Sequence, residues 1–306
     1  MFILIFNQLL KMLLIMLVAF LCYRIHIVNQ EGNRCVSNLL LMVVNPCLII
    51  TVYQMDYDPV LVKGLLISFA AAAVSHFISV TAAHFLIPAK DNPEYAVERF
   101  ASVYSNCGFI GIPLINSVLG AEGVFYLTAY MTVFNILTWT HGLSLMQGKL
   151  SGRQLLQGLR TPMVIATVLA MLLYFLRIEI PSTLRASMDY LADMNTPLAM
   201  MVAGFSVAQA DLKKILKKGR IYWVSFLKLL VMPLLTMIFL VAAGLEYNVA
   251  YVILIAVACP TATTTTMMAI RYNKNYTYAS EIFAISTVLS IITIPLATLI
   301  AGIFIH

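Results

Sequence analysis

The dominant pattern in this chain is a succession of long apolar runs separated by short polar connections. A run of about 17–25 apolar residues is long enough to cross a bilayer as a helix. Runs of this kind recur ten times, at residues 2–23, 36–54, 60–87, 97–118, 121–145, 162–179, 186–208, 221–244, 248–270 and 280–304. The sequence therefore predicts an all-α polytopic membrane protein with ten transmembrane helices and no soluble domain.

Two of these spans, one in each half of the chain, are interrupted near their middles. The interruption in the fourth span includes Asn106, Gly111 and Pro113, and the one in the ninth includes Cys259-Pro260-Thr261. Proline removes a backbone donor and clashes with the preceding turn, so we expect each helix to break there. Within a bilayer, non-helical backbone is tolerated only where protein or a water-filled cavity covers it. Matching interruptions in two halves are typical of a transporter's binding site.

The order of the spans predicts two halves of opposite orientation. Five spans precede residues 146–161 and five follow, so the second half enters the membrane from the other face. Residues 1–145 form the first predicted five-helix repeat, and residues 162–306 form the second. Pro46 in the second span and Pro197 in the seventh are a further matched pair, although a lone proline more often marks a packed kink.

Composition and charge agree with this assignment. The chain is 61% hydrophobic and 10% charged, with a mean hydropathy of +0.92, whereas soluble domains carry about 25% charged residues. The net charge of +6 comes from lysine and arginine in loops on one side. The positive-inside rule then makes residues 146–161 a short cytoplasmic linker and places both termini outside the plasma (inner) membrane. The basic excess reflects topology and does not predict a nucleic-acid partner.

The sequence contains none of several common motifs of enzymes and metal sites. The five cysteines include no CxxC pair and lie in or beside apolar spans, which favours packing over a disulfide or a metal site. The chain has no HExxH, GxSxG or Walker motif and no paired carboxylates within a span. We therefore expect neither an enzyme nor a cofactor.

The interrupted spans instead predict an anion site. After each break, the next half-helix presents free amide groups and a positive dipole end toward the middle of the membrane. Such ends suit a carboxylate. Candidate hydrogen-bonding side chains are Asn106, Asn116, Thr261, Thr263, Thr264, Thr265 and Thr266. Because threonines in membrane helices often bond back to the preceding turn, we expect only some of the five to face the site.

Four basic or titratable side chains within spans are further candidates, since ionisable groups in membranes are often functional. Lys11 pairs with an anionic substrate or else snorkels to the interface. Lys228 lies near the cytoplasmic end of the eighth span, where snorkelling is the favoured interpretation. His76 and His141 are candidate proton carriers, with simple packing as the alternative.

An ordered set of short motifs resembles the auxin efflux carrier family, which includes bacterial members and the plant PIN exporters. The motifs are Tyr23-Arg24, Pro46, Asn106, Gly111-Ile112-Pro113, Thr161-Pro162, Pro197-Leu198-Ala199, Gly204, Lys228, Pro233-Leu234 and Cys259-Pro260-Thr261-Ala262-Thr263. The resemblance covers essentially the whole chain. It implies two inverted five-helix repeats with broken helices that cross in spans four and nine. It also makes Asn106 the site asparagine and Pro113 and Pro260 the crossover prolines.

The resemblance also implies a function. Members carry organic anions: indole-3-acetate in plants, and dicarboxylates such as malate or malonate in bacterial cases. A homodimer is implied, in which spans 3–5 and 8–10 move like an elevator against spans 1, 2, 6 and 7. The short central loop and the run Thr263–Thr266 depart from the family pattern.

The resulting hypothesis is a secondary transporter of a small organic anion, with coupling to a proton or sodium left open. The alternatives are a sodium-coupled symporter of the bile-acid type and a membrane anion receptor that does not transport.

Overall fold

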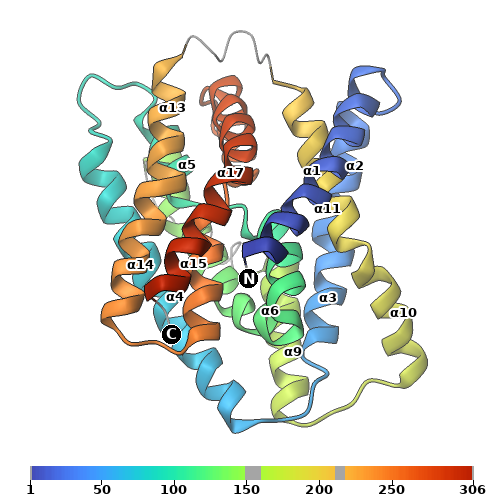
Figure 1. The fold of residues 1–306 in the computed structure, drawn as a ribbon. Coiled ribbons are helices and arrows are strands. Elements are labelled where there is room, and N and C mark those ends of the chain that lie inside the picture. The colour runs from blue at the N-terminus through green and yellow to red at the C-terminus, as the bar shows by residue number, and fades with distance from the viewer. Residues whose placement is uncertain (1, 149–159, 211–217, 305–306) are drawn as a thin grey trace.

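The computed structural model describes residues 2–148, 160–210 and 218–304, and within them every regular element is a helix. Figure 1 shows these helices running between two opposite ends of the molecule, where the connecting loops gather. The α-helices are α1 (Phe2–Arg24), α2 (Gln30–Leu39), α3 (Asn45–Val52), α4 (Pro59–Leu86), α5 (Tyr95–Val103), α6 (Ile112–Leu137), α7 (Leu143–Gln147), α9 (Pro162–Phe175), α10 (Ser182–Asp193), α11 (Asn195–Ala208), α13 (Gly219–Phe226), α14 (Met232–Ala242), α15 (Tyr247–Ala258), α16 (Thr264–Arg271) and α17 (Tyr276–Phe304). Wider π-helical turns form η1 (Leu40–Val44), η2 (Cys107–Gly111), η3 (Thr138–Gly142) and η4 (Leu227–Val231).

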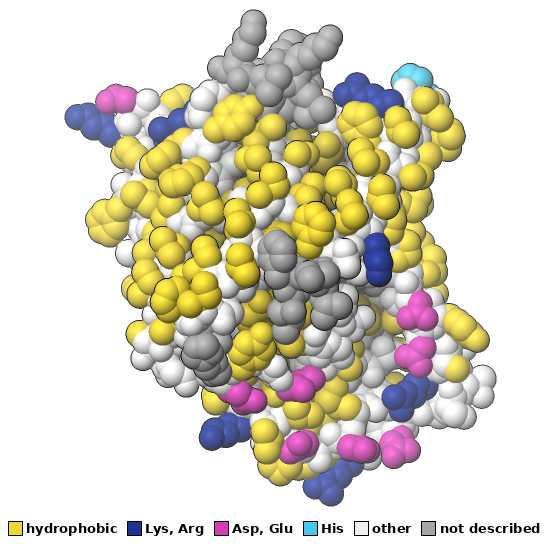
Figure 2. Space-filling view, viewed as in Figure 1, with side chains coloured by type: hydrophobic (Ala, Val, Ile, Leu, Met, Phe, Trp, Pro, Cys, Tyr) yellow, Lys and Arg dark blue, Asp and Glu magenta, His cyan; other side chains and the backbone are white. Residues whose placement is uncertain are grey.

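Several of these helices are suited to crossing a membrane. In the described residues, six helical segments are long and apolar enough: Ile5–Arg24, Gln30–Val52, Pro59–Leu86, Cys107–Gln147, Gly219–Ala242 and Tyr276–Phe304. Figure 2 shows hydrophobic side chains over the middle of one face and charged side chains mostly toward its two ends. The structure is therefore that of a multi-pass membrane protein. The ten-span count remains a prediction, because the other predicted spans are short or interrupted helices.

At three prolines within predicted spans, the helix continues through a wider, π-helical turn and does not break. The π-helical turns η1, η2 and η4 each end two residues before a proline, namely Pro46, Pro113 and Pro233. A proline donates no backbone hydrogen bond and its ring displaces the carbonyl four residues earlier, which a wider turn accommodates. The prediction that the fourth span breaks at Pro113 is therefore wrong. The backbone leaves helical geometry earlier, at residues 104–106, and Pro113 lies in the first turn of α6.

A glycine separates the fourth and fifth predicted spans. Inside α6, Gly120 has φ 63° and ψ −154°, a conformation that favours glycine. Beyond Gly120, the end of α6 lies close to the end of α5. The Tyr104 hydroxyl, which follows α5, donates to the Leu137 carbonyl at 2.8 Å. Gly120 lies between the predicted spans 97–118 and 121–145.

Helices α1 and α11 pack closely along each other, and a glycine makes this contact possible. A Cβ atom added to Gly204 would clash with the Met16 carbonyl oxygen. Small residues allow such close approach between membrane helices.

The start of α11 also contacts the start of α3. There the side-chain amide of the buried Asn195 donates to Asn45 Oδ1 at 2.7 Å.

Candidate functional site

Two non-helical segments, one from each half of the chain, lie side by side in the interior. Residues 104–106 follow α5, and residues 259–263 connect α15 to α16. They pair as a single antiparallel bridge between Ser105 and Thr261. The backbone N–H of Asn106 donates to the Pro260 carbonyl at 2.7 Å, and the backbone N–H of Ala262 donates to the Tyr104 carbonyl at 2.9 Å. Each segment thus satisfies backbone groups that the other lost when its helix ended.

Side-chain hydrogen bonds anchor this pairing to the surrounding helices. The Thr261 hydroxyl donates to the Ala101 carbonyl at 3.0 Å, and the Thr261 amide donates to Ser286 Oγ at 3.2 Å. The Ser105 hydroxyl donates to the Val257 carbonyl at 3.3 Å. Thr261, a predicted substrate-binding residue, therefore uses its hydroxyl within the protein.

Other polar atoms beside the paired segments are buried without a partner in the protein. Asn106 is only 4% exposed, and its side-chain Nδ2 forms no hydrogen bond. The hydroxyls of Thr264 and Thr265, in the first turn of α16, are likewise buried and unpartnered. Thr263 is half-buried directly before them. A buried donor without a partner is costly, so these groups are candidates for hydrogen bonding to a ligand.

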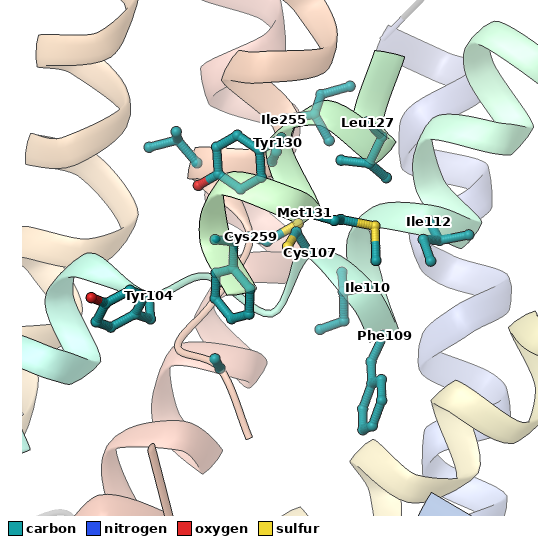
Figure 3. Packing of buried hydrophobic residues seen from close by; sticks show 14 of the residues in the cluster. Tyr104, Cys107, Phe109, Ile110, Ile112, Leu127, Tyr130, Met131, Ile255 and Cys259 are labelled. Carbon is teal, nitrogen blue, oxygen red and sulfur yellow. The ribbon is translucent and has the colours of Figure 1, made fainter. Parts of the chain in front are cut away.

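The remaining predicted residues pack the segments together. A Cβ atom on Gly111 would lie 3.3 Å from Cys107 Cβ and 3.4 Å from Cys259 Sγ. Figure 3 shows Cys107 and Cys259 close together among Tyr130, Met131 and other apolar side chains. Both cysteines are free and buried. In contrast, Asn116 is exposed on α6, so the structure does not bring it to this site.

Lys228 differs most from the sequence-based interpretation. The snorkelling interpretation is wrong, because the residue is fully buried. Its ammonium donates to Ser105 Oγ at 2.5 Å and to the Val257 carbonyl at 3.2 Å. The position of a residue along a span indicates its depth, but it does not indicate which face of the helix lies against the protein. Here η4 turns Lys228 toward the paired segments.

The two histidines contact aromatic residues near the same segments. His76 is buried on α4, its Nδ1 lies 2.8 Å from the Ala72 carbonyl and its ring packs on Tyr130. Tyr130 in turn places its hydroxyl 3.5 Å from Ser105 Oγ. His141 is half-buried, with Nδ1 3.0 Å from the Tyr104 hydroxyl.

Lys11 lies elsewhere. It is exposed on α1, with no ion pair to a described carboxylate. Sequence reasoning also missed Ser105, which belongs to the first segment, and Tyr130 and Ser286, whose side chains contact the two segments. Only Ser105 carried a local signal, since it directly precedes Asn106. The other two come from distant helices and belong to no motif.

A second polar cluster joins α5 to α13 and α17. The buried Glu98 carboxylate accepts two hydrogen bonds from Arg220, at 2.8 and 2.7 Å, and one from the Tyr278 hydroxyl at 2.8 Å. Lys218 pairs with Glu281 at 2.6 Å. An open surface pocket of about 520 Å³ lies against this cluster, and its walls are Asp91, Asn92, Glu94, Glu98, Lys218, Gly219, Arg220 and Tyr278. Both ion pairs hold the ends of these helices together.

Comparison with known sequences supplies the family. The profile of the family described as "Membrane transport protein", which is the auxin efflux carrier family, matches residues 4–298. The chain belongs to this family. It is a membrane transport protein and not an enzyme.

Relatives of this auxin efflux carrier family member carry related names. An "Uncharacterized transporter" of Methanothermobacter thermautotrophicus is 23% identical over 300 residues, covering 94% of this chain and 95% of its own. "Uncharacterized transporter YfdV" of Escherichia coli K12 is 23% identical, covering 95% of both chains. A "Putative malonate transporter" of Rhizobium meliloti is 26% identical over 213 residues, covering 66% of this chain and 65% of its own.

Proposed function

We propose that this protein is a secondary transporter of a small organic anion. The observation that carries the proposal is the Asn106 side-chain amide, which is buried and unpartnered where the two non-helical segments meet. An amide N–H is a donor and suits a carboxylate oxygen. The adjoining starts of η2 and α16 add free backbone amides and positive dipole ends.

The substrate class follows from these donors. A carboxylate would accept hydrogen bonds from Asn106 and from the hydroxyls of Thr263 and Thr264, which add no net charge. Gly111, Pro113 and Pro260 would shape the backbone around it. We infer a carboxylate such as malonate, malate or an auxin-like acid. The name of the Rhizobium meliloti relative supports the dicarboxylate choice.

The wider architecture that we propose is the one the family resemblance implies. Ten spans would form two inverted repeats, residues 1–145 and 162–306, joined by a cytoplasmic linker at 146–161. Most of that linker, residues 149–159, lies outside the described residues. Both termini would face outward from the plasma membrane, and two copies would form a homodimer.

The proposed elevator movement has a candidate sliding surface. A narrow cleft of about 10 Å³ lies where α1 and α11 face η2 and α17, lined by Leu9, Met12, Leu13, Met16, Ile110, Met200, Thr287, Ser290 and Ile291. In the proposal, α1 and α11 belong to the static part, and η2 and α17 to the moving part. Methionine side chains adapt easily to changed packing, which suits a surface that slides.

Transport by the purified, reconstituted protein tests this proposal. Liposomes loaded with malonate should take up radiolabelled malonate in a saturable way, and external malate should compete. The same assay with imposed proton or sodium gradients identifies the coupling ion. Saturable binding without uptake would contradict transport and favour an anion receptor.

A further inference from the structure

Lys228 is a buried charge without a counter-charge. It is fully buried in η4, and it forms no ion pair with any carboxylate in the part of the chain that the structure describes. The buried acids Glu98 and Glu281 pair instead with Arg220 and Lys218. An isolated ammonium in a dry interior is expensive. Something other than a carboxylate must therefore compensate it.

The ammonium has two direct oxygen partners, and both lie at or just beyond the C-terminal end of a helix. Val257, whose carbonyl accepts from the Lys228 ammonium, lies in the last turn of α15, and Ser105 follows the end of α5 by two residues. The C-terminal end of a helix carries about half a negative charge. In transporters with broken helices, such ends and the unwound carbonyls coordinate sodium ions or protons. The ammonium thus lies where the partial negative charge of helix ends favours a cation.

The titratable groups around the ammonium carry no formal charge in their ordinary state. Cys107 of η2, Cys259 of the second segment and His76 of α4 are near enough to interact with it electrostatically. Tyr130 of α6 reaches it through Ser105. Its direct hydrogen bonds go to a hydroxyl and a backbone carbonyl, which are also the oxygen ligands that bind a metal cation.

We propose that the Lys228 ammonium is a tethered cation, standing where a coupling sodium ion would bind between the ends of α5 and α15. As a consequence, the carrier works without sodium. The inference rests on the proposed transport function for its meaning, but the cation site itself can be tested without any substrate. It distinguishes this chain from a sodium-coupled symporter built on broken helices.

The test is the melting temperature of the detergent-purified full chain in sodium, potassium or choline chloride of equal ionic strength. The wild type should melt at one temperature in all three salts. Lys228→Ala should melt lower, because it leaves the Ser105 hydroxyl and the Val257 carbonyl without a cation. It should regain at least about 3 °C when sodium or n-propylammonium, which matches the deleted atoms, replaces choline. Lys63→Ala, which removes an exposed lysine of α4, should respond to no cation.

The outcomes separate this inference from the proposed function. A wild type that sodium stabilises specifically would overturn the tethered cation, and this comparison needs no variant to fold. A Lys228→Ala protein that melts like the wild type and ignores n-propylammonium would also overturn it. Failure of the wild type to carry malonate would instead count against the transport proposal and leave the melting result standing.

Discussion

At the scale of single residues, hydrogen bonding divides the threonines of the second segment and of the start of α16 into two groups. Thr261 is fully buried, and both its amide and its hydroxyl have partners. The hydroxyls of Thr264 and Thr265 have none within the protein. A hydroxyl with a partner stabilises the fold, whereas a buried hydroxyl without one costs stability and is available to a ligand.

This division predicts opposite effects of one substitution. Thr261→Val should lower the free energy of unfolding by about 1 kcal/mol or more, because the Ala101 carbonyl loses its donor. Thr264→Val should leave stability unchanged or raise it, and should weaken malonate uptake. Thermal melting and uptake measured on both variants test the point. Equal melting temperatures for the two would contradict the assignment.

Sequence reasoning reached some of these residues and not others. Asn106 and Pro260 could be found because proline and polar residues within apolar spans are visible along the chain. The role of Lys228 could not, because its partner Ser105 lies 123 residues away. Only the folded packing decides that the lysine points inward and does not reach the membrane surface.

At the scale of elements, long apolar runs located the helices well, and prolines located the irregularities only roughly. The helix of the first half ends at residues 104–106, before Pro113. There the opposite segment supplies hydrogen-bond partners for the backbone groups that are no longer helical. Pro113 itself lies in the first turn of α6, and the wider turn η2 directly before it accommodates its ring. The position of a break thus depends on tertiary pairing, which a single sequence does not display.

The contact of α1 with α11 gives a prediction at this scale. Gly204→Ala should destabilise the protein by about 1–3 kcal/mol, the usual cost of overpacking, because the new methyl group would meet the Met16 backbone. Gly302→Ala in α17 is the matched control, since nothing lies within 4 Å of its added Cβ. Melting temperatures of the two variants make the comparison. A Gly204→Ala variant as stable as Gly302→Ala would show that α1 and α11 do not pack as described.

At the scale of the whole molecule, charge sets the proposed orientation. Charged side chains lie mostly toward the two ends of the face in Figure 2, as expected for a surface that lipid surrounds in the middle. The positive-inside rule assigns the end with Arg24 and Arg34 to the cytoplasm. The family and the multi-pass character were predictable from composition and motifs, and both are confirmed. The repeats, the dimer and the orientation stay predictions.

Cys35 provides a native probe of this orientation. It is exposed on α2, next to Arg34, and should therefore face the cytoplasm. A membrane-impermeant maleimide should label it in inverted vesicles and not in intact cells. The Cys35→Ser variant should lose that labelling, because Cys22 and Cys47 are half-buried and Cys107 and Cys259 are buried. Labelling of Cys35 in intact cells would reverse the proposed topology.

The most direct test of the account compares two asparagine variants in malonate uptake by proteoliposomes. Asn106→Ala removes the buried, unpartnered side-chain amide, whereas Asn116→Ala removes an exposed side-chain amide of α6, away from the paired segments. Because a hydrogen bond to a charged group contributes about 1.5–3 kcal/mol, Asn106→Ala should lower uptake at low malonate concentration by about tenfold or more. Its melting temperature should stay that of the wild type. Asn116→Ala should transport like the wild type. Undiminished uptake by Asn106→Ala would contradict the placement of the anion between the paired segments.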